Sequence, residues 1–272
     1  MAKIYAMSDI QGCYDAFEDA LKVVDFKNIE NKLILIGDYI DRGPESFKSL
    51  DKVFRLVHEY PDQIIALKGN HEEWFLDFLR EEDPELTWAQ NDDLLALNSF
   101  IGGTEFDNDI YIDMYNSSPQ LKRISNDEEV TQRVINTILE KHGELIRWVD
   151  QLDCYHECNN QIFVHAGISE FLNEDWKLTD ERTMQEKYPE VLGSFLKDIV
   201  SGHIGTKSMW KKYTSQDNYG IFWDGENHYY IDGTTEESGH VNVLVWENGI
   251  GYYDGYTGNQ IAPYSAYIYE EF

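Results

Sequence analysis

The sequence has few positively charged residues. Its 272 residues include 22 lysines and arginines but 51 aspartates and glutamates, which gives a formal net charge of −29. A surface this acidic repels nucleic acid and anionic membranes at long range, so we expect neither as a partner. A small anionic substrate is still compatible with this charge, because metal ions or arginines in one cleft can reverse the local field.

Cysteines and long apolar runs are also scarce. Three cysteines do not make a disulfide framework, so we expect a reducing, cytoplasmic location. Cys154 and Cys158 flank His156, but no second ligand pair follows at zinc-site spacing, and we do not expect zinc there. No apolar run is long enough to predict a transmembrane helix, and the N-terminus lacks the pattern of a signal peptide.

The first third of the chain alternates between two kinds of pattern. Short apolar runs predict strands at 3–8, 33–37 and 64–67. Helical spacing of apolar residues follows each run, at 14–24, in the segment that begins at Pro44, and at 72–80. This alternation predicts an α/β fold with parallel strands.

The rest of the chain changes character twice. Residues from about 84 to 150 are polar and partly helical, as at 130–142, and we interpret them as a mainly helical insertion over one edge of the sheet. Strands return at 161–165 and 199–202. Closely spaced runs then follow at 220–223, 228–231, 241–246 and 249–254, which predict an antiparallel second sheet. No linker or repeat divides the chain, so we expect one domain over residues 1–272.

Polar residues follow five of the predicted strands. Asp9, Asp38, Asn70, His165 and His203 each stand at a strand end, beside glycine or a glycine-containing turn. Ligands bind outside the carboxyl ends of strands in parallel sheets, so these side chains should converge in one crevice. One such residue alone is more often structural, but five together favour a metal site. A carboxylate can bridge two ions about 3.5–4 Å apart, the spacing of two-metal hydrolases.

Three neighbouring residues suit phosphate chemistry. Arg42 is flanked by Gly43 and can clamp a phosphate with two parallel hydrogen bonds. His71 follows Asn70 and can protonate a leaving oxygen if a carboxylate orients its ring, and Asp41 is the candidate partner. Two bound ions would also acidify a water molecule and make it a nucleophile at neutral pH.

Taken in order, these segments resemble the signature blocks of the PPP-type metallophosphatases. That family includes bacterial serine/threonine protein phosphatases and symmetrical diadenosine tetraphosphate hydrolases. The matching segments are SDIQG at 8–12, GDYIDRG at 37–43, GNHE at 69–72, HAG at 165–167 and GH at 202–203. The resemblance implies a calcineurin-like β-sandwich flanked by helices.

The resemblance also implies roles for the strand-end residues. Asp9 and Asp38 would hold a first metal ion, with Asp38 bridging to a second ion. Asn70, His165 and His203 would complete the second site.

The same resemblance assigns the residues that act on the substrate. His71, paired with Asp41, would be the general acid, and Arg42 and Asn70 would contact the phosphate.

The sequence departs from the family pattern at two places. Gln11 stands where the family usually has a histidine ligand, so the first site would be all oxygen and would prefer Mn²⁺ or Mg²⁺. We therefore expect two divalent ions, with Mn²⁺ favoured over Fe, Zn or Mg. The alternative is that Gln11 points away and water takes its place. A second phosphate-binding arginine is missing from its usual segment, and neither Arg182 nor Lys187 fits that motif.

Three functions are compatible with these motifs. The leading expectation is a bacterial-type serine/threonine phosphoprotein phosphatase. A dinucleoside polyphosphate hydrolase is the alternative, which Gln11 favours slightly. The third is a phosphatase fold that binds a phosphorylated partner without turnover. The substrate would be a phosphorylated protein or a small phosphate compound, and the sequence predicts no oligomeric state.

Overall fold

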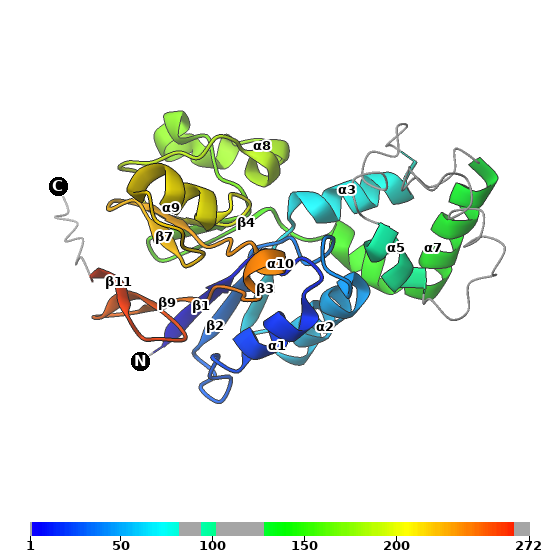
Figure 1. Cartoon of the computed structure of the whole chain (residues 1–272), viewed down its shortest axis with the longest axis horizontal. Coiled ribbons are helices and arrows are strands. Elements are labelled where there is room, and N and C mark those ends of the chain that lie inside the picture. Colours follow the sequence, from blue (N-terminus) through cyan, green and yellow to red (C-terminus); the bar gives the residue numbers. More distant parts are fainter. Residues whose placement is uncertain (1, 82–93, 102–127, 264–272) are drawn as a thin grey trace.

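The structure is a computed structural model that describes residues 2–81, 94–101 and 128–263. It contains two β-sheets that face each other, with helices on both outer sides (Figure 1). In the described part of the chain, no helix is long and apolar enough to cross a membrane.

The first sheet contains the N-terminal strands that the apolar runs predict. Strands β1 (Lys3–Met7), β2 (Lys32–Leu35) and β3 (Ile64–Ala66) are parallel neighbours. They alternate with helices α1 (Tyr14–Leu21), α2 (Ser46–Glu59) and α3 (Asn70–Leu79). The C-terminal strands β9 (Leu244–Glu247), β10 (Gly251–Asp254) and β11 (Gln260–Pro263) extend the sheet antiparallel from β1, in the order β11-β10-β9-β1-β2-β3.

The second sheet differs from the prediction. Its order is β4 (Tyr155–Cys158), β5 (Gln161–Val164), β6 (Asp198–Ser201), β8 (His228–Tyr230) and β7 (Phe222–Trp223). The three central strands are parallel, and only the edge strands β4 and β7 run antiparallel. The prediction of an antiparallel second sheet is therefore wrong. Helical crossovers separate the parallel strands, and the runs after residue 241 join the first sheet instead.

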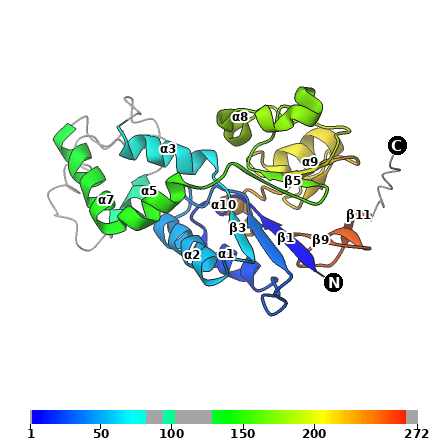
Figure 2. The same ribbon diagram turned by 180° about the vertical axis from the view of Figure 1, so that it is seen from behind.

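Three apolar layers hold these elements together. The inner faces of the two sheets meet in a core that includes Ile34, Phe163 and Tyr229. The outer face of the first sheet packs against α1, α2 and α3, and α5 (Leu94–Ile101) and α7 (Glu128–Asp150) extend the same apolar cluster outward. The second sheet packs against η1 (Glu170–Leu178), α8 (Glu181–Glu186) and α9 (Thr206–Thr214), as the view from behind also shows (Figure 2). The expected β-sandwich flanked by helices is confirmed.

The segment that we interpret as an insertion is described in part. Helix α5 packs against α2, and α7 packs against α2, α3 and α5. The predicted helix at 130–142 lies inside α7, which continues past a kink at His142 to Asp150. The His142 ring donates a hydrogen bond from Nε2 to the carbonyl of Phe100 over 2.7 Å, which ties the kink to α5. Residues 84–93 and 102–127 lie outside the described residues.

Candidate active site

The loops that follow β1 and β2 are joined by backbone hydrogen bonds. The amide of Asp9 donates to the carbonyl of Gly37 (3.1 Å), and the amide of Gln11 donates to the carbonyl of Asp38 (2.9 Å). The amide of Gly43 in turn donates a hydrogen bond to the carbonyl of Gln11 (2.8 Å). Two loops that are distant in the sequence are thereby fixed side by side at the carboxyl ends of parallel strands.

The backbone at this position is unusual. Left-handed φ angles are costly for residues other than glycine and gather where surrounding structure enforces them, often at functional sites. Among the described residues, six of the eleven non-glycine residues with positive φ lie in these strand-end loops: Asp9 (54°), Gln11 (49°), Asp38 (55°), Asp41 (76°), Arg42 (53°) and His203 (63°). The fold therefore holds strained backbone where the sequence predicts a site.

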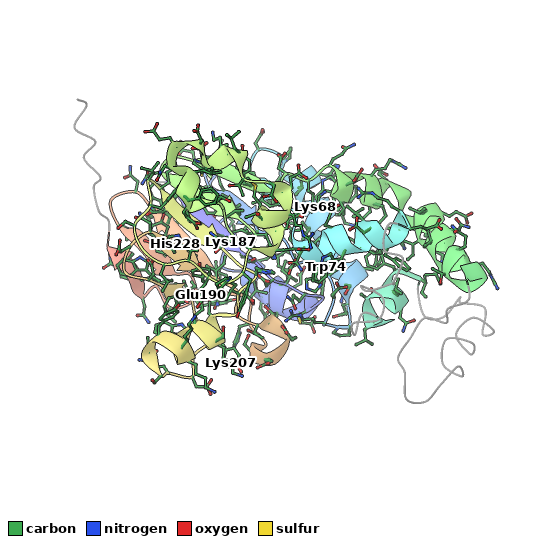
Figure 3. The ribbon with its side chains drawn as sticks, turned by 90° about the horizontal axis from the view of Figure 1, so that it is seen from above. Lys68, Trp74, Lys187, Glu190, Lys207 and His228 are labelled. Atoms are coloured by element: carbon green, nitrogen blue, oxygen red, sulfur yellow. The ribbon has the colours of Figure 1, made fainter. Side chains whose placement is uncertain are left out.

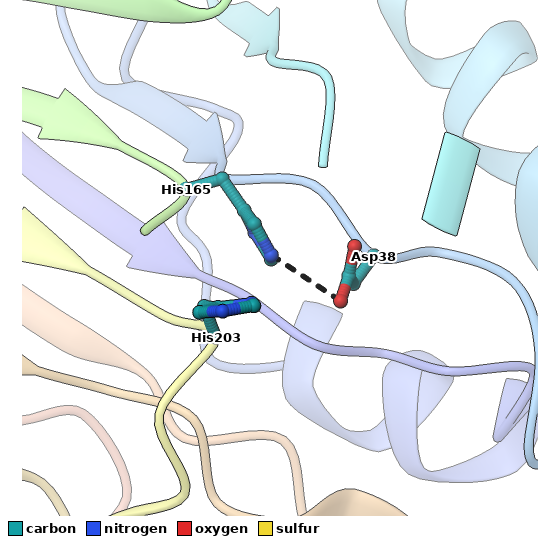
Figure 4. Close-up of side chains that lie close together, drawn as sticks. All are labelled: Asp38, His165 and His203. Carbon is teal, nitrogen blue, oxygen red and sulfur yellow. Dashed lines mark ion pairs between the residues drawn. The ribbon is translucent and has the colours of Figure 1, made fainter. Parts of the chain in front are cut away.

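A group of potential metal ligands converges at these strand ends (Figure 4). The donor atoms of Asp38, His165 and His203 all lie within 4.8 Å of one another, and His165 Nε2 is 3.3 Å from Asp38 Oδ2. Asn70 Oδ1 lies 2.9 Å from His165 Nε2 and 3.0 Å from His203 Nδ1. His165 donates from Nδ1 to the carbonyl of Ile36 (2.8 Å), so its other nitrogen faces the group.

Asp9 and Gln11 supply oxygen atoms that the protein leaves without a partner. Asp9 Oδ2 accepts hydrogen bonds from Ser8 Oγ (2.6 Å) and from the amide of His203 (3.1 Å). Its Oδ1 atom and Gln11 Oε1 are buried and have no hydrogen-bond partner among the described residues. Burying such an oxygen unpaired costs about 1–3 kcal/mol. A divalent cation can satisfy buried oxygen atoms of this kind, so the residues present fit a metal centre.

Two glycines let the chain approach the candidate carboxylate ligands. A Cβ atom at Gly69 would lie 2.1 Å from Asp38 Oδ1, and one at Gly202 would lie 2.1 Å from Asp9 Oδ2. No side chain fits at either distance. The glycines of the GNHE and GH segments are therefore needed for close packing around the site.

His71 lies against two carboxylates. Its Nδ1 is 2.6 Å from Asp41 Oδ2, and its Nε2 is 3.7 Å from Asp38 Oδ2. Burial disfavours the charged ring, but Asp38 and Asp41 outweigh this effect and raise the pKa of His71 to about 9. With Nδ1 donating to Asp41, a protonated ring presents its second proton from Nε2.

Glu72 is a supporting residue to which the sequence analysis gave no role. Its carboxylate accepts three backbone N–H bonds, from Asp38 (2.8 Å), Tyr39 (2.8 Å) and Gly69 (3.0 Å). The residue is fully buried, and burial, together with the charge of Asp38, raises its pKa to about 7. A glutamate three residues after a helix cap is a known capping signal, which could have identified this role from the sequence.

An acidic segment that no sequence motif indicated reaches the site from the second half of the chain. Helix α10 (Thr235–Ser238) begins with Thr235, whose hydroxyl donates to the carbonyl of Asp9 (2.7 Å). The next residue, Glu236, accepts a hydrogen bond at Oε1 from Arg42 Nη1 (2.7 Å). Asp232 lies buried nearby, and burial together with Asp9 raises its pKa well above the ordinary range.

The two cations left unassigned by the sequence analysis are engaged elsewhere. Arg182 Nε donates to Glu186 Oε2 over 2.9 Å, and its side chain is 84% exposed. Lys187 pairs with Glu170 and donates to the carbonyl of Ile168. Neither contact places a second arginine beside Arg42.

A β-sandwich with carboxylate, amide and imidazole donors gathered at its strand ends has the architecture of a metallophosphoesterase. The chain belongs to the calcineurin-like phosphoesterase family, whose sequence profile matches residues 2–246. This confirms the resemblance seen in the signature segments.

Similar curated proteins match only part of the chain. The symmetrical bis(5'-nucleosyl)-tetraphosphatase of Delftia acidovorans is 46% identical over 69 residues, which are 25% of this chain and 23% of that protein. The enzyme of the same name from Legionella pneumophila strain Corby is 35% identical over 91 residues, or 34% and 30% of the two chains. The matches thus span about a quarter to a third of those relatives.

Solved structures match over most of the chain at low identity. A putative diadenosine tetraphosphatase has a TM-score of 0.50 at 16% identity, covering 94% of this chain and 95% of its own. A protein serine/threonine phosphatase from Saccharomyces cerevisiae has a TM-score of 0.53 at 13% identity, covering 91% and 73%. At these identities the matches establish the shared fold.

Proposed function

We propose that the protein is a two-metal hydrolase of phosphate esters or anhydrides. The observation that carries the proposal is the convergence of ligand atoms around Asn70 Oδ1, next to the His71–Asp41 pair. In this proposal Asn70, His165 and His203 would hold the second ion, and the Asp38 carboxylate would serve both ions.

The first ion would be held by Asp9 and Gln11 together with Asp38. The unpartnered Asp9 Oδ1 and Gln11 Oε1 atoms support this assignment and favour a Gln11 side chain that takes part in binding. When bound, the two ions would acidify water and offset the charge of the phosphate.

The protein's own residues would then handle the leaving group and the phosphate. His71 gives the proton on Nε2 to the departing oxygen, while Asp41 keeps the ring oriented through Nδ1. Arg42 binds phosphate oxygens after exchanging its contact with Glu236 for the substrate. Asp41 and Arg42 lie in the loop between β2 and α2, and His71 lies in the first turn of α3.

For the substrate, we favour a dinucleoside tetraphosphate over a phosphoprotein. The names of the partial relatives in Delftia and Legionella support this order, as does Gln11, and they reverse the order that the sequence analysis preferred. The direct test is turnover of diadenosine tetraphosphate and of a phosphoserine peptide with Mn²⁺ present. Efficient release of ADP is expected. Turnover of the peptide alone would restore the phosphoprotein assignment, and no turnover with any divalent metal would favour a binding module.

The two metal sites should differ in affinity. Oxygen donors suit Mn²⁺ or Mg²⁺, whereas the two histidines of the second site suit a wider range of metals. After extensive dialysis, we expect the second ion to be retained and the first to be lost. Equal retention of two zinc ions per chain would contradict this asymmetry.

A further inference from the structure

A partly exposed tryptophan lies next to the proposed proton donor. Trp74 is three residues after His71 on α3, so both side chains project from the same side of the helix. The two ring centroids are 5.0 Å apart at an interplanar angle of 54°. Trp74 is 37% exposed, whereas Phe75 and Phe78 on the same helix are buried in the core. An aromatic surface is therefore open to solvent beside the site.

The orientation of this indole is fixed from the second half of the chain. Trp74 is labelled in Figure 3. Its Nε1 donates a hydrogen bond to Glu186 Oε1 over 2.8 Å, and Glu186 ends α8. The other oxygen of Glu186 accepts from Arg182, so the carboxylate is itself anchored. Because Nε1 lies on the ring edge, this bond restrains the indole without covering its faces. A ring held in this way is suited to stacking.

We propose that Trp74 forms a stacking subsite for a planar aromatic group on the leaving side of the substrate. The inference rests on the proposed function, in which His71 protonates the leaving oxygen. The chemical group attached to that oxygen must then lie close to His71. It must therefore also lie close to the indole of Trp74, which packs against His71. Both an aryl ester and a nucleobase offer the π face that such a subsite binds.

The test compares aryl and alkyl substrates in two variants. Trp74→Leu keeps an apolar side chain but removes the ring, and Trp74→Phe keeps a ring without the Nε1 donor. We expect Trp74→Leu to lower the ratio of kcat/KM for p-nitrophenyl phosphate over glycerol phosphate by roughly five- to hundredfold, and Trp74→Phe to lower it much less. If Trp74 only positions His71, glycerol phosphate loses at least as much as p-nitrophenyl phosphate, because its more basic leaving oxygen depends more on a proton donor. The ratio would then stay constant or rise, which would overturn the proposal.

A second pair of substrates identifies whether the subsite binds a nucleobase or an aryl ester. A nucleobase subsite predicts the same selective loss for diadenosine tetraphosphate relative to inorganic tripolyphosphate in Trp74→Leu. A loss confined to p-nitrophenyl phosphate assigns the subsite to aryl esters. Tyr213→Leu serves as the matched control, since Tyr213 is an exposed aromatic residue on α9 that pairs with Glu190 away from His71. The control should leave both ratios unchanged.

Binding without turnover separates this inference from the proposed function. The affinities of the Mn²⁺-loaded protein for phenylphosphonate and methylphosphonate can be measured by calorimetry even if no substrate is hydrolysed. We expect wild type to prefer the phenyl compound and Trp74→Leu to lose that preference. Equal affinity of wild type for the two compounds would overturn the subsite, whatever the hydrolysis assays show.

Discussion

Replacing Glu236 by glutamine should tighten the binding of inorganic phosphate by up to about fivefold. In the structure, Arg42 Nη1 donates to Glu236 Oε1 over 2.7 Å, with the two side chains 45% and 23% exposed. A phosphate that binds Arg42 through Nη1 must displace this carboxylate. Partly exposed ion pairs are worth about 0.2–1 kcal/mol, which corresponds to a factor of roughly 1.4 to 5 in affinity.

The assay is competitive inhibition by inorganic phosphate of p-nitrophenyl phosphate turnover, at about 0.1 M and 1 M salt. Glu237→Gln is a matched control, because Glu237 is the next residue of α10 and pairs with Lys207 (2.7 Å) instead of Arg42. We expect a lower inhibition constant for Glu236→Gln alone, with a smaller difference at high salt because the Debye length falls from about 10 to 3 Å.

Two results would refute this reasoning. Weaker phosphate binding in Glu236→Gln would mean that Glu236 positions Arg42 for the substrate and does not compete with it. An equal gain in Glu237→Gln would mean that only the net charge of α10 matters, and that the contact seen with Arg42 is not specific.

Three further predictions concern the metal site and its support. Gln11→His should slow the loss of the first ion on dialysis and raise the zinc content, since imidazole suits zinc; unchanged content by elemental analysis would exclude Gln11 as a ligand. Glu72→Ala should lower the free energy of unfolding in urea by at least about 1–3 kcal/mol, because three buried N–H donors lose their acceptor. Burial lowers the pKa of His228, but Asp224 and Glu170 outweigh burial and raise it to about 9. The contribution of this ion pair to the stability of the folded protein is therefore complete below pH 6.5 and is lost as the pH rises through 9. When the pH is raised from 6.5 through 9, the urea midpoint of unfolding should fall more in wild type than in His228→Gln.

The sequence predicted best those features that depend on neighbouring residues in the chain. Each strand-end residue stands beside its own glycine and directly after an apolar run, so local patterns place Asp38 and His165 at strand ends. Asp38 follows β2 of the first sheet and His165 follows β5 of the second, and the packing of the two sheets brings the residues together. The structure places their side chains 3.3 Å apart, although 127 positions separate them in the chain. The resemblance of the signature segments was sufficient for the family. The strand-end pattern named Asp38, His165 and His203, whose donor atoms the structure brings together.

Sequence patterns do not predict contacts between residues that lie far apart in the chain. Glu236 reaches Arg42 across 194 positions, and no spacing near either residue signals that contact. The topology of the second sheet was missed for a related reason. Four closely spaced runs from residue 220 onward suggested one antiparallel sheet, but α10 lies between β8 and β9 and these two strands belong to different sheets. Local turn chemistry does not determine which sheet a strand joins.

The central claim, that the strand-end residues form a two-metal hydrolytic site, is tested most directly by a Mn²⁺ titration of chelator-treated protein. Bound metal and turnover of p-nitrophenyl phosphate are measured on the same samples. We predict no turnover at zero occupancy and full turnover near two ions per chain, with His203→Ala binding fewer ions. Full activity of the metal-free protein, or activity that saturates at one ion per chain, would contradict the account.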